Sequence, residues 1–145
     1  PFQLNKKATN FQLCVQDYFD PFVLFTVAMQ PDPLVSDESA QFNVSGTLTK
    51  KNITAGQTIL EIVFAPYIQI FDKSYDAGIP FAIFALNVSV PTLPDSYYNL
   101  VFVGDPTSDP KYPLDIYGCA RAAMIGSFCV ILLLLSVRDS WRYYI

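Results

Sequence analysis

The sequence predicts an all-β fold, an immunoglobulin-like sandwich of two antiparallel sheets followed by an apolar C-terminal tail. The chain has 145 residues, enough for one domain with a hydrophobic core. Hydrophobic residues make up 52% of it and charged residues 15%, a balance that excludes an intrinsically disordered protein. Short runs rich in Val, Ile, Phe and Tyr recur between Pro, Gly, Asn and Asp, which is typical of a sandwich rather than a helical bundle.

The predicted strands follow one another from residue 11 onward, after ten residues that have no pattern and are expected to form a lead-in. Turns are predicted between them because Pro, Gly and Asp cluster there, as in the Pro-Asp-Pro run at 31–33. The predicted strands cover residues 11–16, 22–29, 40–49, 58–71, 79–90, 97–103 and 114–125.

The alternation of apolar and polar residues predicts which face of each strand is turned to the core, because successive side chains point to opposite faces. We take Asn43, Glu61, Asn87 and Asn99 as markers of the solvent face of their strands. The residues then predicted to face inward are Phe42, Val44, Leu48, Leu60, Ile62, Phe64, Leu86, Val88, Val90, Tyr98, Leu100 and Phe102.

These inward residues are large and apolar, and two interpretations fit them. One is a filled sandwich core, the commonest use of such residues. The other is an apolar cavity between the sheets, to which the spacing adds two residues of the second strand and one of the last. The residues expected to line such a cavity are Phe25, Val27, Phe42, Val44, Leu60, Ile62, Phe64, Tyr98, Leu100, Phe102 and Ile116.

The residue types present exclude several classes of function. Histidine is absent, so neither a Ser-His-Asp or Cys-His catalytic site nor a typical zinc site can form. The net charge is −4 and no basic run exceeds two residues, which disfavours nucleic-acid binding. We therefore expect a protein that is not an enzyme and that uses no metal or cofactor. A glycosidase that works with carboxylates alone is a distant alternative, since no acidic pair stands out.

Three Asn-x-Ser/Thr triplets, beginning at Asn43, Asn52 and Asn87, favour a glycosylated secretory protein. The alternative is that polar strand and turn residues match the motif by chance. The chain opens with Pro1 and Phe2 and has no visible signal peptide, so we expect a mature form whose leader was removed. The expected location is the extracellular space or the lumen of a vacuole or endosome.

Several short segments occur in an ordered series along the chain. These are a cysteine in the first predicted strand (Cys14), Met-Gln-Pro-Asp-Pro-Leu-Val at 29–35, Phe-Asn-Val-Ser-Gly-Thr-Leu at 42–48, Ala-Gly-Gln at 55–57, Val-Pro-Thr-Leu-Pro at 90–94 and Leu-Asp-Ile-Tyr-Gly-Cys at 114–119. Over residues 11–125 the series resembles the ML family of lipid-recognition domains. That family includes Niemann-Pick-type sterol carriers and fungal phosphatidylglycerol/phosphatidylinositol transfer proteins. The chain departs from it by lacking cysteines near 71–81 and by having Asp95 and Ser96 where a glycine is usual.

The resemblance implies a non-catalytic carrier that holds a phospholipid, sterol or fatty acyl chain between its sheets. Its partners would be the lipid, membranes touched transiently and a protein receptor. The resemblance also implies a disulfide between Cys14 and Cys119, with two buried thiols as the alternative. Cys129 is left over, either unpaired or bonded to another chain. The competing function is an immunoglobulin-like adhesion or receptor-binding module with a solid core.

The C-terminal segment does not fit the family. Residues 122–137 are uncharged and include four consecutive leucines, and Arg138, Trp141 and Arg142 follow them. As a helix they would span about 24 Å, less than the roughly 30 Å of a bilayer core. We predict a helix over 128–137 that stays out of the sandwich, and either attaches to a membrane or packs on the domain or a second copy. The domain boundaries are thus 1–10 for the lead-in, 11–126 for the sandwich and 127–145 for the tail.

Overall fold

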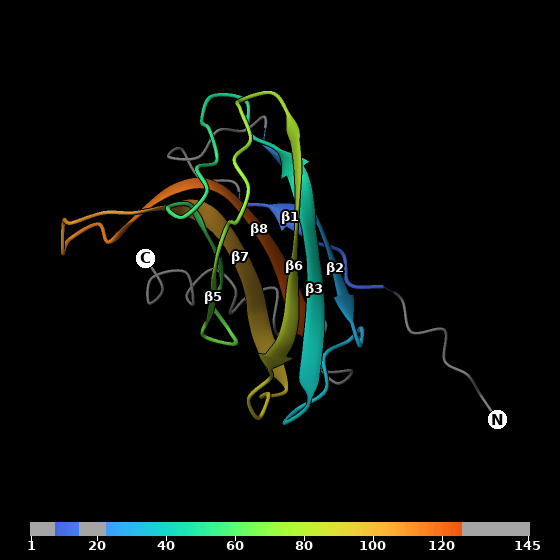
Figure 1. Cartoon of the computed structure of the whole chain (residues 1–145). Helices are drawn as coiled ribbons and strands as arrows, with labels where there is room; N and C mark the ends of the chain where they lie inside the picture. The colour runs from blue at the N-terminus through green and yellow to red at the C-terminus, as the bar shows by residue number, and fades with distance from the viewer. Residues whose placement is uncertain (1–7, 15–22, 126–145) are drawn as a thin grey trace.

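The computed structural model describes residues 8–14 and 23–125, and over these residues the chain contains strands and no helix. The strands are β1 (Gln12–Leu13), β2 (Leu24–Gln30), β3 (Ser39–Thr47), β4 (Ile59–Ile62), β5 (Tyr67–Ile70), β6 (Pro80–Ser89), β7 (Ser96–Pro106) and β8 (Leu114–Ile125). They form a five-stranded sheet, ordered β1-β8-β7-β4-β5, and a three-stranded sheet, ordered β2-β3-β6 (Figure 1). Every strand pairing is antiparallel and the two sheets pack on each other, so the predicted β-sandwich is confirmed.

The alternation rule succeeds most clearly in β3, the central strand of the smaller sheet. Ala40, Phe42 and Val44 are buried there, and the residues between them are exposed, Asn43 included. In β6 the alternation breaks, because Leu86 and Asn87 are both exposed. The register with β3 shifts at this point and Asn87 has a φ of 56°. A bulge of this kind reverses the face of the residues beyond it, so the inward position predicted for Leu86 is wrong.

The single strand predicted over 58–71 is two strands, β4 and β5, joined by a turn at 63–66. The turn residues are Val, Phe, Ala and Pro, so hydrophobicity does not fall where the chain reverses. Pro66 is the one sequence signal of the turn, because proline has no N–H for a strand ladder. The Val63 N–H donates to the Leu100 carbonyl at 3.0 Å and holds the turn against β7.

In β7 the predicted face assignment is wrong. Asn99, Val101 and Val103 are buried between the sheets, whereas Tyr98, Leu100 and Phe102 are half-buried on the opposite face. The error comes from treating Asn99 as a solvent marker. The pairing with β8 agrees with this inward face of β7, because Val101 and Val103 pair with Ala120 and Gly118, which are also buried.

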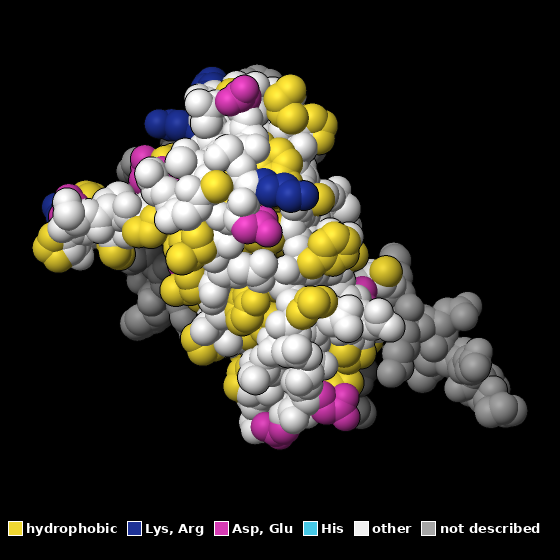
Figure 2. Space-filling model, in the orientation of Figure 1, with side chains coloured by type: hydrophobic (Ala, Val, Ile, Leu, Met, Phe, Trp, Pro, Cys, Tyr) yellow, Lys and Arg dark blue, Asp and Glu magenta, His cyan; other side chains and the backbone are white. Residues whose placement is uncertain are grey.

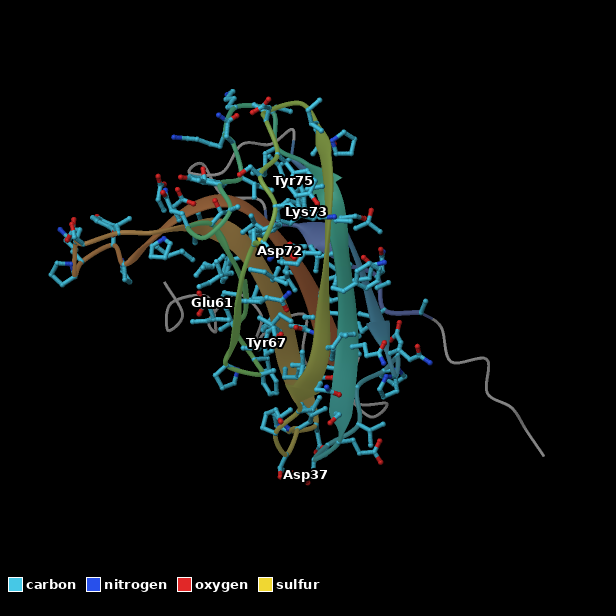
Figure 3. The ribbon with its side chains drawn as sticks, in the orientation of Figure 1. Asp37, Glu61, Tyr67, Asp72, Lys73 and Tyr75 are labelled. Atoms are coloured by element: carbon cyan, nitrogen blue, oxygen red, sulfur yellow. A yellow bond between two sulfur atoms is a disulfide. The ribbon has the colours of Figure 1, made fainter. Side chains whose placement is uncertain are left out.

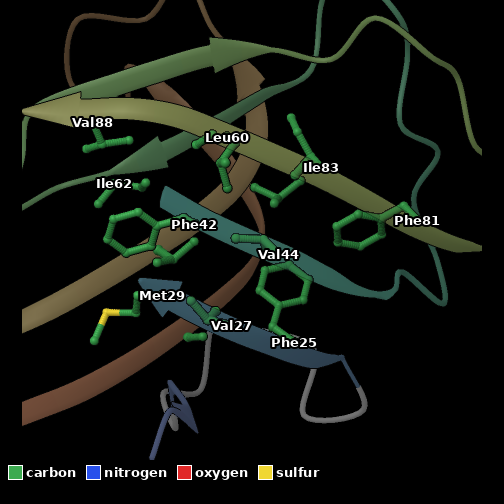
Figure 4. Packing of buried hydrophobic residues seen from close by; sticks show 14 of the residues in the cluster. Phe25, Val27, Met29, Phe42, Val44, Leu60, Ile62, Phe81, Ile83 and Val88 are labelled. Atoms are coloured by element: carbon green, nitrogen blue, oxygen red, sulfur yellow. The ribbon is translucent and has the colours of Figure 1, made fainter. Parts of the chain in front are cut away.

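Small residues on β8 let the two sheets approach closely. The ring of Phe25, on β2, lies against Gly118, where an added Cβ would come within 2.3 Å of the Phe25 Cζ atom. Ala120 and Ala122 continue this small-residue face along β8. The larger side chains of β2, β3, β4 and β6 fill the space between the sheets (Figure 4).

A disulfide joins Cys14 to Cys119, as the family resemblance implies, with the Cα atoms 5.5 Å apart. It ties the short edge strand β1 to β8, and the Cys14 N–H also donates to the Cys119 carbonyl at 3.3 Å. The predicted tail helix at 128–137 and Cys129 lie outside the described residues. Among the described residues there is no helix able to cross a membrane.

Side chains also close the sandwich where β5 and β6 face each other as the edge strands of their sheets. Gln69 Nε2 donates to the Phe84 carbonyl at 3.0 Å, and Tyr67 Oη donates to Gln69 Oε1 at 2.7 Å. The Gln69–Phe84 bond links the two sheets and occupies a carbonyl group of the β6 edge, and the bond from Tyr67, within β5, holds the Gln69 amide. An edge with occupied backbone groups is a poor template for pairing with another chain.

Candidate functional site

The space between the sheets is an apolar layer made by residues of both. Six residues predicted to line a cavity belong to it: Phe25, Val27, Phe42, Val44, Leu60 and Ile62. The only buried polar side chains among the described residues are Thr58 and Asn99, which lie toward opposite ends of the sandwich. A hydrocarbon ligand in this layer would therefore contact almost no polar group. The polar side chains nearest to it would be Thr58 at one end and Asn99 at the other.

The remaining five predicted residues do not lie in this layer. Tyr98, Leu100 and Phe102 belong to the outer face of β7, for the reason given above. Ile116 pairs with Gly104 beyond a register shift in the β7–β8 ladder, which turns it away from the face of Gly118. Phe64 is half-buried in the β4–β5 turn.

Asn99 is the residue that the sequence prediction missed as part of the interior. Its side chain is fully buried, and its Nδ2 donates to the Met29 sulfur at 3.4 Å. Its Oδ1 is buried without a hydrogen-bond partner. A buried acceptor left unpaired costs about 1–3 kcal/mol. An asparagine buried in this way is either a structural cost or a binding group for a donor that comes from outside the chain.

Two aromatic side chains lie at the same end of the sandwich as Asn99, which we call the Asn99 end. Tyr97 lies two residues before Asn99 on the same face of β7, and its ring contacts that of Phe64 at a tilt, with 4.7 Å between the centroids. Burial raises the pKa of Tyr97, and the nearby negative charge of Asp32 raises it further. Asp32 in turn accepts hydrogen bonds from the backbone N–H and the hydroxyl of Thr9. Aromatic surface therefore borders polar groups at this end.

The loops at the Asn99 end are acidic. They comprise residues 31–38, 63–66 and 90–95, and carry Asp32, Asp37, Glu38 and Asp95 without any Lys or Arg. On the face shown in Figure 2 this end has acidic side chains and no basic one among the coloured residues, and Asp37 marks it in Figure 3. The loops at the opposite end, residues 48–58, 71–79 and 107–113, carry Lys50, Lys51, Lys73 and Lys111. An anionic group would be repelled at the Asn99 end.

At the opposite end, the Asp105 end, the buried polar groups are paired. Thr58 Oγ1 donates to Asp105 Oδ1 at 2.6 Å, and Gln57 Nε2 donates to the other carboxylate oxygen. Burial raises the pKa of Tyr117 to about 12, helped by its hydrogen bond to Asp105 and by the negative charges of Asp105 and Asp115. The Lys51 ammonium lies 5.4 Å from the centre of the Tyr117 ring. This network closes its end of the sandwich.

The asparagines of the three Asn-x-Ser/Thr triplets are exposed. Asn43 lies in the middle of the outer face of the smaller sheet, and Asn87 lies at the β6 bulge. Asn52 lies in a loop, where its Oδ1 accepts a hydrogen bond from the Ala77 N–H at 2.7 Å. Their exposure agrees with the predicted faces, and their glycosylation stays a prediction.

Within the described ranges no group of three or more Cys, Asp or Glu side chains is arranged to hold a metal ion. Comparisons of the chain with protein-family models, with curated proteins and with solved structures found no match.

Proposed function

We propose that this chain is a non-catalytic lipid-binding and transfer protein that holds its ligand between the two sheets, as its resemblance to the ML family implies. The observation that carries the proposal is the unpaired Oδ1 of Asn99 at the end of an otherwise apolar layer. Such a combination suits a ligand with a long hydrocarbon part and one hydrogen-bond donor. Burying the hydrocarbon contributes about 0.8 kcal/mol per CH₂ group.

The charge at the Asn99 end limits the head group that would fit. Asn99 Oδ1 is an acceptor, so it binds a donor and offers nothing to a carboxylate or phosphate. Asp32 and its acidic neighbours repel those anions. An uncharged lipid with a hydroxyl group matches both features, and we take it as the ligand class among the phospholipids, sterols and acyl chains considered above.

Entry at this end requires few side chains to move. Phe64 and Tyr97 are half-buried and their rings contact each other, and Met29, whose sulfur accepts the Asn99 hydrogen bond, has a flexible thioether side chain. Movement of the Phe64 ring in the β4–β5 turn would open the layer to Asn99 without breaking a strand pairing. The Cys14–Cys119 disulfide is compatible with an extracellular or lumenal location, where we propose that the protein works.

The proposal is tested by extracting the purified full-length chain and identifying co-purified lipids by mass spectrometry. Transfer of a fluorescent sterol and a fluorescent fatty acid between neutral vesicles then compares the two head groups. Val44→Trp adds bulk in the middle of the apolar layer, where the hydrocarbon part of the ligand would lie, and should abolish transfer with the fold retained. Leu100→Trp, on the outer face of β7, is the matched control and should leave transfer intact.

The adhesion module with a solid core is the second candidate, and exposed apolar side chains favour it. Ile68, Ile70, Phe84 and Leu86 are all more than half exposed on the outward faces of β5 and β6. A chain that carries no lipid, transfers none and unfolds with Val44→Trp would establish a solid core and this second function. Co-purified lipid together with a folded, transfer-deficient Val44→Trp variant would establish the first.

A further inference from the structure

The outer face of the smaller sheet carries one of the Asn-x-Ser/Thr triplets beside an exposed aromatic ring. Asn43 of β3 and Phe84 of β6 are directly paired across the antiparallel ladder. Both side chains point away from the core, and Phe84 is 59% exposed. The Cβ atoms of such a pair are about 4.5–5.5 Å apart, so a group attached to the Asn43 amide would start beside the Phe84 ring.

The surroundings of this pair leave room for a bulky group. On the other side Asn43 pairs with Ala28 of β2, and Ser45, two residues along β3, pairs with Ala82. Both alanines are exposed, and their methyl side chains are too small to block the Asn43 amide. Phe84 is therefore the one large side chain among these direct neighbours of Asn43 and Ser45.

The other two triplets lack this arrangement. Asn52 uses its Oδ1 to hold the Ala77 N–H, so its amide plane is already fixed within a loop. Asn87 occupies the bulge with a positive φ, within the register shift near the end of β6. Only the Asn43 triplet lies in regular strand with a cross-strand aromatic partner.

We propose that Asn43 carries an N-linked glycan whose first sugar packs on the ring of Phe84 and covers this face of the smaller sheet. The Asn43 Nδ2 attacks the anomeric carbon of an oligosaccharide linked to a lipid diphosphate, which the secretory pathway supplies. A C–N bond forms, the C–O bond to the diphosphate breaks with its electron pair, and one amide proton is lost. The apolar face of the sugar then removes part of the Phe84 ring from water, and the glycan keeps this face from associating with another protein.

The test expresses the full chain with a host secretion leader in a eukaryotic cell. Peptide mapping after enzymatic deglycosylation measures occupancy at each asparagine, and thermal unfolding is compared before and after glycan removal. We expect Asn43 to be occupied and its deglycosylation to lower Tm by about 3 °C, a shift of the size that one such contact produces. In Phe84→Ser, which keeps the triplet, removal of the glycan should leave Tm unchanged.

Ser45→Ala is the matched control, because it removes the triplet while Asn43 and Phe84 remain. It should abolish occupancy at residue 43 and should have the Tm of the deglycosylated wild-type chain. An unmodified Asn43 in the secreted protein would overturn the proposal. A Tm loss of equal size with and without Phe84 would overturn it too, because the sugar would then not depend on the ring.

Discussion

The two ends of the sandwich differ in how they treat their buried polar groups. At the Asp105 end the buried Thr58 hydroxyl donates a hydrogen bond to the Asp105 carboxylate. This carboxylate also accepts hydrogen bonds from the Gln57 amide and the Tyr117 hydroxyl. At the Asn99 end the buried amide has only a sulfur atom as acceptor for its N–H and no donor for its oxygen. The described loops follow the same division: those at the Asn99 end, residues 31–38, 63–66 and 90–95, carry acidic residues and no lysine, and those at the other end carry four lysines among acidic residues.

The buried polar groups at the Asp105 end are paired within the chain, whereas the Asn99 oxygen has no donor within the described residues. A fully paired network stabilises the fold, and removing one member lowers the free energy of unfolding because its buried partners are left without hydrogen bonds. An unpaired buried acceptor stabilises nothing within the chain. The Asp105 end should therefore respond to mutation through stability, and the Asn99 end through ligand binding.

The largest expected effect belongs to the disulfide, which fixes β1 to β8. Changing Cys14 and Cys119 together to Ser opens a loop with a sequence separation of 105 residues. The chain-entropy model gives a loss of about 4–5 kcal/mol in the free energy of unfolding, measured by urea denaturation. A reducing agent should produce the same loss in the wild-type chain and none in the variant. If the variant kept its full stability, the disulfide would not constrain the fold.

The second effect is confined to the Asp105 end. Asp105→Ala leaves the buried Thr58 hydroxyl without its acceptor and should cost about 2–3 kcal/mol of unfolding free energy. Asp95→Ala, an exposed acidic residue at the other end, is the control and should change stability by less than about 0.5 kcal/mol. Lipid transfer should be unaltered in the folded fraction of either variant. Equal losses from the two changes would mean that the network contributes no more than net charge does.

A smaller effect is expected from pH. The pKa of Tyr117 is about 12 in the folded chain, above the value of about 10 for an unfolded tyrosine. Its contribution to stability is therefore fully present below pH 10, and is lost as the pH rises through 12. Tyr117→Phe should lose less stability over that range than the wild-type chain, measured by denaturation at each pH. The phenolate absorbance of the variant should also lack one titrating tyrosine near pH 12. The same alkaline loss of stability in both chains would assign the effect to other groups.

The same contrast explains how far the sequence could predict the fold. Most strand positions followed from the β-rich runs and the turns from Pro and Gly. The faces of β3 followed from alternation, because one face of β3 is exposed to solvent and carries polar residues such as Asn43. The β4–β5 turn is apolar throughout, so only Pro66 indicated it. The bulge at Asn87 reversed the pattern in β6, and no local hydrophobicity records such a shift.

The candidate site was harder to predict, for a related reason. The residues of β2, β3 and β4 were assigned to the interior correctly, but β7 was assigned to the wrong face because Asn99 was taken as exposed. Alternation cannot separate a polar residue exposed to water from one that is buried. The competing pattern was present in Tyr97, Val101 and Val103, which share the face of Asn99. Ala120 and Gly118 of β8, which pair with the two valines, are small and also indicated the interior.

The most direct test of the central claim is Asn99→Leu, which removes both polar atoms and keeps a similar volume. We expect the free energy of unfolding to stay equal or to rise by about 1 kcal/mol, because no internal bond to the oxygen is lost. The affinity for a hydroxyl-bearing lipid, measured by fluorescence titration of the full chain, should fall about tenfold, the equivalent of about 1.4 kcal/mol. A loss of stability above about 2 kcal/mol with unchanged lipid affinity would contradict the account, and would make Asn99 a structural residue.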